Sequence, residues 1–210
     1  MKKPAKRSPM ALAALAMLYE APMHPYRMQR LIKERGKDEV INVTQRAGLY
    51  QTIGRLEREK LIASQPVTRN ENRPERTVYE ITEAGRATVL EWMRQILSKP
   101  AREFPEFPAA ISFLALLTPK DARNQLELRI TAIEAQIARI DAGLKQAAVV
   151  PRLFLLEIEL LRAAQVTELS WVKSVVADLR SRRLIWSAAW LRRIAAQLAE
   201  VGAPGVTDDE

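Results

Sequence analysis

Four residues suited to contacting a nucleic acid recur at helical spacing in the segment 46–64, RAGLYQTIGRLEREKLIAS. On a helical wheel they lie on one side, within about 80° of one another: Gly48, Gln51, Arg55 and Arg58. An arginine can pair twice with guanine and a glutamine twice with adenine in the major groove of DNA, while a glycine lets the backbone approach a phosphate. None of the four is acidic, although a helix face that meets only water usually mixes glutamate with lysine. The pattern favours a surface that reads DNA; the alternative is that Gln51 and Arg55 merely solvate a helix.

The opposite side of the same segment carries an apolar stripe. Ile53 and Leu56 fall within about 40° of Leu49 on the wheel. Leu61 and Ile62 extend the apolar surface beyond the end of the helix. We therefore expect a helix that buries its leucines and presents the glutamine and arginines outward.

The segments before this helix predict two further helices. Ser8 is a suitable N-cap for a helix that begins at Pro9 and ends at Glu20. Pro25 opens a second helix that stops at Gly36.

A hairpin is predicted after the third helix. The stretches LIASQPVTRN and RTVYEIT favour strands, and the polar stretch NENRPE separates them. Thr82 then caps a helix that runs to about Leu97. Three helices followed by a hairpin form a winged helix-turn-helix, in which the hairpin is the wing.

Three arginines surround the predicted wing: Arg69, Arg73 and Arg76. Wing arginines enter the minor groove or contact phosphates. The alternative is an ordinary polar loop, since two glutamates dilute the charge. The basic N-terminal arm, MKKPAKR, either adds salt-sensitive and sequence-blind affinity or only increases solubility.

The charge of the chain is concentrated in its N-terminal part. Residues 1–82 hold 16 Lys and Arg against 9 Asp and Glu, whereas residues 83–210 hold 17 against 16. Such asymmetry points to a polyanionic partner for the N-terminal part, either nucleic acid or an anionic membrane.

The composition argues against catalytic and metal chemistry. The chain has no cysteine and one histidine, His24, which excludes a thiolate or histidine metal site, and no cofactor is expected. Glu157 and Glu159 are two residues apart and lie on different sides of a helix, and no Ser-His-Asp arrangement or Gly-rich loop is present. We therefore expect a protein that is not an enzyme.

The N-terminus has two interpretations. MKKPAKRSPMALAALAMLYEA resembles a bacterial signal peptide, but Leu12, Leu15 and Leu18 also fit the interior of the first helix of a cytosolic domain. The weak hydrophobicity of this run favours the second interpretation. Since no stretch approaches the ~20 apolar residues of a membrane span, we expect a cytoplasmic protein.

The segment SKPAREFPEFP, with three prolines and opposed charges, is the predicted domain boundary. The predicted parts are a winged-helix domain over 1–98, a linker over 99–108, an all-helical domain over 109–201 and a disordered tail over 202–210.

An apolar seam runs along the predicted helix 120–147, and Leu169 lies on the helix that is predicted to begin at Pro151. The seam has heptad spacing and consists of Leu126, Ile130, Ile133, Ile137, Ile140 and Leu144. We expect the seam and Leu169 to dimerise the protein, although the partner of the seam is either the 151–180 helix of the same chain or a second chain. A homodimer would place two reading helices about one DNA turn apart, roughly 34 Å, on a pseudo-palindromic operator.

These segments together resemble the PadR-type transcriptional regulators over about residues 9–180. The family pattern G-x-LY-x-x-L-x-x-LE-x-x-GLI is matched at Leu49-Tyr50, Ile53, Leu56-Glu57 and Leu61-Ile62. Its wing closure, R-x-x-Y-x-LT-x-x-G, is matched at Arg73-Pro74, Tyr79, Ile81-Thr82 and Gly85. Tyr26, FPAAISFLALLTP and ELSWV are similar to further family segments.

Two departures leave the operator sequence open. The family's small entry to the recognition helix reads QRAG here, which introduces Arg46, and Lys60 stands where the family has glycine. The stretch 181–201 also extends past the family pattern.

The resemblance implies a dimeric and usually repressing transcription factor that a small hydrophobic or aromatic effector releases from double-stranded DNA. The residues expected to contact DNA are Arg46, Gly48, Tyr50, Gln51, Arg55, Arg58, Arg69, Arg73 and Arg76. Four aromatic residues are candidates for the effector pocket, although large aromatics also serve as plain core: Trp92, Phe104, Phe107 and Trp171.

An alternative function is that of a cationic helical protein that binds membrane surfaces or protein partners, with the winged helix as an interaction module. The stretch RRLIWSAAWLRRIAAQL is basic and bears tryptophan, as interfacial helices do. Bundle packing explains the same pattern, because Leu184, Leu191 and Leu198 share a seam with alanines.

Overall fold

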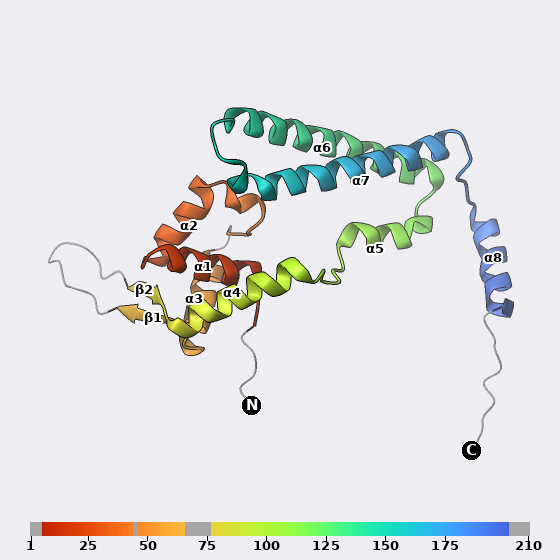
Figure 1. Cartoon of the computed structure of the whole chain (residues 1–210). Helices are drawn as coiled ribbons and strands as arrows, with labels where there is room; N and C mark the ends of the chain where they lie inside the picture. Colours follow the sequence, from red (N-terminus) through yellow and green to blue (C-terminus); the bar gives the residue numbers. More distant parts are fainter. Residues whose placement is uncertain (1–5, 44–45, 66–76, 202–210) are drawn as a thin grey trace, which may run out of the picture. The chain divides into compact units, whose positions relative to one another are not determined.

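The computed structural model describes residues 6–43, 46–65 and 77–201 (Figure 1). The chain divides into two compact units, residues 1–102 and 103–210. The first unit contains three helices, a two-stranded sheet and a fourth helix: α1 (Pro9–Glu20), α2 (Pro25–Glu34), α3 (Arg46–Arg58), β1 (Ile62–Gln65), β2 (Val78–Ile81) and α4 (Glu83–Ser98). A single 3₁₀ turn, Lys37–Glu39, lies between α2 and α3. The order is that of a winged helix-turn-helix, as predicted.

Side-chain caps set where the helices of the first unit begin. The Ser8 hydroxyl accepts a hydrogen bond from the Ala11 N–H at 3.2 Å. His24 does the same for α2, since its Nδ1 accepts from the Tyr26 N–H at 3.0 Å. Thr82 caps α4 by accepting from the Gly85 N–H at 3.0 Å. Each cap satisfies a backbone donor that the first turn of a helix leaves without a partner.

The hairpin is antiparallel and its register is fixed at both ends, with Ile62 opposite Ile81 and Gln65 opposite Val78. Met23, between α1 and α2, adds a third short stretch to this sheet. Its N–H donates to the Tyr79 carbonyl at 3.0 Å, and the Tyr79 N–H donates back at 3.1 Å. The base of the wing is therefore fastened to the helix-turn-helix.

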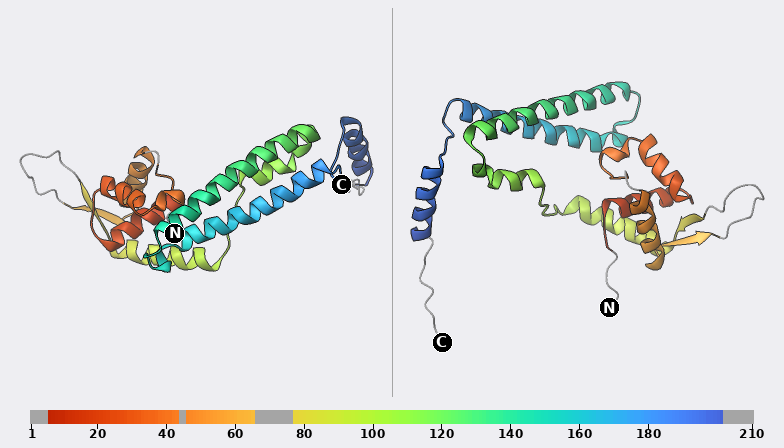
Figure 2. Two further views of the ribbon diagram at one scale, coloured as in Figure 1. Left: turned by 90° about the horizontal axis from the view of Figure 1, so that it is seen from above. Right: turned by 180° about the vertical axis from the view of Figure 1, so that it is seen from behind.

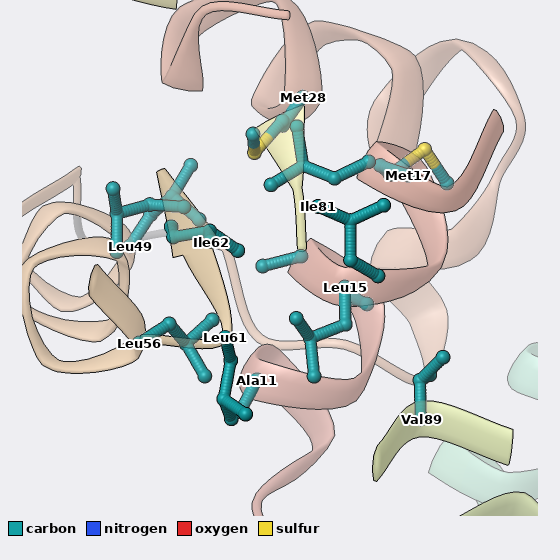
Figure 3. Packing of buried hydrophobic residues seen from close by; sticks show 14 of the residues in the cluster. Ala11, Leu15, Met17, Met28, Leu49, Leu56, Leu61, Ile62, Ile81 and Val89 are labelled. Atoms are coloured by element: carbon teal, nitrogen blue, oxygen red, sulfur yellow. The ribbon is translucent and has the colours of Figure 1, made fainter. Parts of the chain in front are cut away.

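The apolar stripe of α3 lies in the core of the first unit, as predicted (Figure 3). Leu49, Ile53 and Leu56 are at most 2% exposed. They pack with Leu15 of α1 and Ile62 of β1, within one cluster of buried side chains. Truncating such a leucine to alanine typically costs about 2–5 kcal/mol, so this stripe holds α3 in one orientation.

The second unit is helical. Its helices are α5 (Glu106–Ser112), α6 (Pro119–Gln146), α7 (Leu156–Arg180) and α8 (Ala188–Val201), with single 3₁₀ turns at Leu114–Leu116 and Arg152–Phe154. The long helices α6 and α7 run side by side as an antiparallel hairpin (Figure 2). Four ion pairs bridge them: Glu127–Arg180, Arg129–Glu168, Glu134–Lys173 and Asp141–Arg162.

The heptad seam of α6 is used within the chain. Leu126, Ile133 and Ile140 are buried, and Leu126 packs with Val172 and Val176 of α7. The other members of the set are partly buried: Ile130, Ile137, Leu144 and Leu169. The seam contacts α7 of the same chain, and its contact with a second chain stays a prediction.

Two helix starts differ from the prediction. The helix expected from Pro151 begins at Leu156, after a 3₁₀ turn, and Leu155 offers no capping side chain. The amphipathic stretch expected from 181 becomes helical only at Ala188, because Arg182 adopts a left-handed conformation with φ of 60° that ends α7. The side chain of Ser187 accepts from the Trp190 N–H at 3.1 Å and opens α8.

Among the helices of the described residues, none is both long and apolar enough to cross a membrane.

Candidate nucleic-acid interface

The outward face of α3 carries the residues that the sequence singled out. Gln51 and Arg58 are exposed, Gly48 and Arg55 are half-buried, and Tyr50 is 49% exposed. Arg46 is the first residue of α3. The start of the helix thus presents a small residue, an amide and a phenol together, which are groups that suit a DNA groove.

Gly48 is not required by the packing of the protein. A Cβ atom built at this position would meet no atom within 4 Å, and its φ is not in the left-handed region. Glycine in a helix interior costs about 1 kcal/mol relative to alanine. The small side of the helix at Gly48 therefore leaves room for a partner to approach the backbone closely.

Arg55 has partners of its own within the chain. Its Nη1 donates to the Lys6 carbonyl at 2.8 Å, and it also lies 3.3 Å from both carboxylate oxygens of Glu59. Its side chain is 23% exposed. Sequence reasoning missed these contacts, although the i,i+4 spacing of Arg55 and Glu59 predicts their ion pair.

Tyr50 lies at the junction of α3 with the wing. Burial is the main cause that raises the pKa of Tyr79 on β2, and the negative charge of Glu57 and the phenol of Tyr50 add to it. Tyr79 therefore stays protonated and neutral at physiological pH. Because its backbone also pairs with Met23, this tyrosine links α3, the wing and the α1–α2 connection.

Several predicted contacts lie outside the described residues. These are the wing arginines Arg69, Arg73 and Arg76, together with Lys2 and Lys3 of the N-terminal arm. Lys6 and Arg7 of the arm are described, and both are exposed. The predicted tail over 202–210 also lies outside the described residues.

Two of the four candidate effector residues come together in the second unit. Phe107 and Trp171 contact edge to face, with ring centroids 6.1 Å apart and an interplanar angle of 82°. The Arg129 guanidinium lies over the Phe107 ring, 3.5 Å from its centroid, and its Nε donates to Glu168 at 2.5 Å. Trp171 is 44% exposed. Aromatic rings beside a guanidinium suit a flat, acidic molecule.

The other two effector candidates have different surroundings. Trp92 is 7% exposed and belongs to the core of the first unit. Phe104 is 82% exposed.

Within the described part of the chain, no group of three or more His, Asp or Glu side chains is placed to hold a metal ion.

The chain is similar in fold to several proteins of known structure. PadR of Bacillus subtilis in complex with operator DNA matches with a TM-score of 0.65 and 16% identity, over 83% of this chain and 99% of that chain. The same protein in complex with p-coumaric acid matches with a TM-score of 0.62 and 15% identity, over 86% and 99%. The Vibrio cholerae virulence activator AphA matches with a TM-score of 0.64 and 19% identity, over 83% and 99%. At these identities the likeness establishes the fold alone.

The family follows from the sequence of the first unit. No curated protein matches the chain significantly in sequence. Residues 14–91 match the model of the transcriptional regulator PadR-like family, and this match spans α3 and both strands of the wing. This match identifies the first unit as a winged-helix domain of the PadR-like family of transcriptional regulators, and the fold shared with solved PadR structures extends over most of the chain.

Proposed function

We propose that this protein is a cytoplasmic, homodimeric repressor that binds a pseudo-palindromic operator and leaves it when an aromatic effector binds. The observation that carries the DNA-reading part is the start of α3, where Gly48 is not needed by the fold and Gln51 is exposed beside it. In this proposal Gln51 contacts a base edge, while Arg46, Tyr50, Arg58 and the wing arginines contact bases or phosphates.

Exposed apolar side chains on the α6–α7 hairpin support a second copy as partner. Leu160 is 72% exposed, Leu128 66% and Val166 41%. The heptad seam builds the hairpin, and we assign the contact with the second copy to these outer side chains. Burying apolar surface between two chains contributes about 25 cal/mol per Å².

The Phe107–Trp171 pair supports an effector site. Arg129 beside it, whose Nε is paired with Glu168, would offer its terminal nitrogens to the carboxylate of an aromatic acid, since hydrogen bonds between guanidinium and carboxylate are charge-assisted. p-Coumaric acid, which Bacillus subtilis PadR binds in a solved complex, is therefore the probe of choice. An effector releases DNA only by the difference in its affinity for the two states of the dimer.

Selection of bound fragments from random DNA tests the reading surface. We expect the selected sequences to share two inverted half-sites about one helical turn apart. Gln51→Ala should relax the preference at one base position per half-site, at a cost of about 1–3 kcal/mol for the correct base. The matched control is Gln95→Ala, an exposed glutamine on α4. Equal weakening on all sequences would show that Gln51 contacts the backbone instead.

Gly48 offers a test in which stability and binding move in opposite directions. Gly48→Ala should raise the free energy of unfolding by about 0.5–1 kcal/mol, because alanine is the better helix former. The same methyl group should weaken operator binding if DNA approaches the backbone here. A variant that is stabilised and binds the operator as tightly as the original would remove Gly48 from the interface.

The effector step is tested by titrating the operator complex with p-coumaric acid. Phe107→Ala should raise the concentration needed for release at least ten-fold, whereas Phe113→Ala, an aromatic that is 68% exposed, should leave it unchanged. Release at the same concentration in all three proteins would place the effector elsewhere.

The sign of regulation is tested with a reporter gene behind the selected operator. Repression predicts higher expression when the regulator is absent, and lower expression in its absence would make the protein an activator.

A further inference from the structure

Arg55 lies on the reading face of α3, but its guanidinium is engaged within the chain. Nη1 donates at 2.8 Å to the carbonyl of Lys6, a residue 49 positions earlier, and Glu59 holds the same nitrogen at 3.3 Å through both of its oxygens. The side chains of Arg55 and Glu59 are only 23% and 28% exposed. Pairing with guanine through both terminal nitrogens would require the bond to Lys6 to break.

The same bond fixes the backbone just before α1. On its far side, the Ser8 hydroxyl caps α1 and Pro9 begins the helix. Lys6, whose carbonyl is one anchor point, and Arg7, the one residue between the two anchor points, both have exposed cationic side chains. The backbone that carries these two cationic side chains is therefore held against α3 at Arg55, close in sequence to the exposed Arg58.

We propose that Arg55 is a positioning residue, which docks the N-terminal arm against α3 so that Lys6 and Arg7 contact the phosphate backbone of the duplex that α3 reads. The inference rests on the proposed DNA interface. In it, the Arg55 guanidinium binds the N-terminal arm and does not bind a DNA base. Its chemical basis is simple: a backbone carbonyl gives the arm a fixed position, and the lysine and arginine side chains provide sequence-blind attraction.

The salt dependence of binding measures the arm directly. Each phosphate contact contributes about 0.9 to the slope of log affinity against log salt concentration. Lys6→Ala/Arg7→Ala should lower this slope by about 1.8. The loss of affinity in this variant should therefore be roughly 60-fold greater at about 0.1 M salt than at about 1 M. The probe is a fluorescent duplex of mixed sequence, titrated with the full chain.

Arg55→Met tests the docking, because it keeps the half-buried aliphatic stem and loses the guanidinium. We expect it to reduce the slope to nearly the same extent as the arm variant, with the selected base preference unchanged. When Arg55→Met is combined with Lys6→Ala/Arg7→Ala, the slope should be almost the same as in Lys6→Ala/Arg7→Ala alone. Arg94→Ala, an exposed arginine on α4, is the control for the loss of one positive charge and should leave the slope unchanged.

A measurement without DNA separates this inference from the proposed function. The chain has no cysteine, so Arg7→Cys can carry a single spin label. Arg55→Met should increase the mobility of that label, while Arg94→Ala should not.

Each contrary result has a definite meaning. A changed preference at one base position in Arg55→Met would make Arg55 a base reader, and losses that add with those of the arm variant would make it a phosphate contact; either overturns the docking role. An unchanged slope in Lys6→Ala/Arg7→Ala overturns the arm contact. Absence of duplex binding by the original protein would instead overturn the proposed function, and the label would still report whether Arg55 docks the arm.

Discussion

Lys60 occupies a backbone conformation that suits glycine. Its φ is 60°, and α3 ends there with the Leu61 N–H donating to the Leu56 carbonyl at 2.9 Å and the Lys60 N–H donating to the Glu57 carbonyl at 2.8 Å. This is the Schellman arrangement, in which the left-handed position is usually glycine. A side chain there costs about 1–2 kcal/mol.

Lys60→Gly should therefore stabilise the first unit. We expect a gain of about 0.5–1 kcal/mol in the free energy of unfolding, since the greater freedom of glycine in the unfolded chain cancels part of the relief. Urea denaturation measures it. Lys60→Ala is the control and should gain nothing, because alanine keeps the Cβ atom; an equal gain for alanine would assign the effect to the lysine charge.

Gly85 is required where β2 meets α4. A Cβ atom at this position would lie 2.0 Å from the Leu61 carbonyl oxygen and 2.7 Å from Cγ1 of Ile81. Gly85→Ala should cost more than about 2 kcal/mol, because the strand must move away from the helix. Gly143→Ala, where nothing lies within 4 Å, should be neutral or stabilising by up to about 1 kcal/mol. Thermal melting of both variants tests these expectations. An unchanged melting temperature in Gly85→Ala would show that the junction of β2 and α4 can accommodate a Cβ atom without loss of stability.

The sequence predicted residues whose role depends on near neighbours. Ser8 and Thr82 were recognisable as caps, and Leu49 and Leu56 as a buried stripe, because capping and periodicity act over a few residues. The bond from Arg55 to the Lys6 carbonyl was not predictable. Every residue has a carbonyl, so a backbone acceptor far away in the chain leaves no pattern in the side chains.

At the scale of elements, α1 and the end of α2 are joined by an ion pair. Arg35 donates to the two carboxylate oxygens of Glu20 at 2.7 and 2.8 Å. These hydrogen bonds are the main cause that lowers the pKa of Glu20 below its ordinary value of 4.5. Since the unfolded chain takes up the proton first as the pH falls, the stabilisation is complete above the ordinary pKa and is lost as the pH falls through the lowered one.

Glu20→Gln should remove this pH-dependent contribution. Near pH 6 we expect a loss of about 0.5–1 kcal/mol, a modest value because both side chains are largely exposed to solvent. The difference from the original protein should shrink in acid. Glu39→Gln, an exposed carboxylate in the same unit, is the control for charge alone. A loss that persists unchanged in acid would mean that packing, and not the ion pair, is responsible.

Element boundaries were predicted well where side chains define them and poorly where backbone geometry does. The hairpin strands and α4 follow from β-branched residues and Thr82. The late start of α8 depends on the left-handed conformation of Arg182, which could not be predicted because arginine has no preference for that conformation. Ser187, which caps α8, could have been recognised from its residue type. The seam of α6 was recognised from its spacing, but heptad spacing does not distinguish a helix of the same chain from one of a second chain.

At the scale of the whole molecule, the exposed apolar side chains of the hairpin predict self-association. Leu160→Glu should shift the protein from dimer to monomer in sedimentation experiments, because a carboxylate would have to be buried at the contact. Leu97→Glu, on the 79% exposed side chain at the end of α4, makes the same chemical change elsewhere and should leave the dimer intact. Dimers of unchanged stability in Leu160→Glu would place the contact on another face.

The four ion pairs between α6 and α7 should respond to salt differently from the proposed contacts with DNA. Each ion pair joins two opposite charges on side chains that are 30–63% exposed, and such pairs contribute little individually to the free energy of unfolding. Screening them by salt should therefore destabilise the hairpin only slightly, because its apolar seam is unaffected. Attraction to a duplex, by contrast, falls steeply with ionic strength. A rise in salt concentration should therefore dissociate the protein from DNA while the second unit remains folded. Dissociation should then be reversible without refolding.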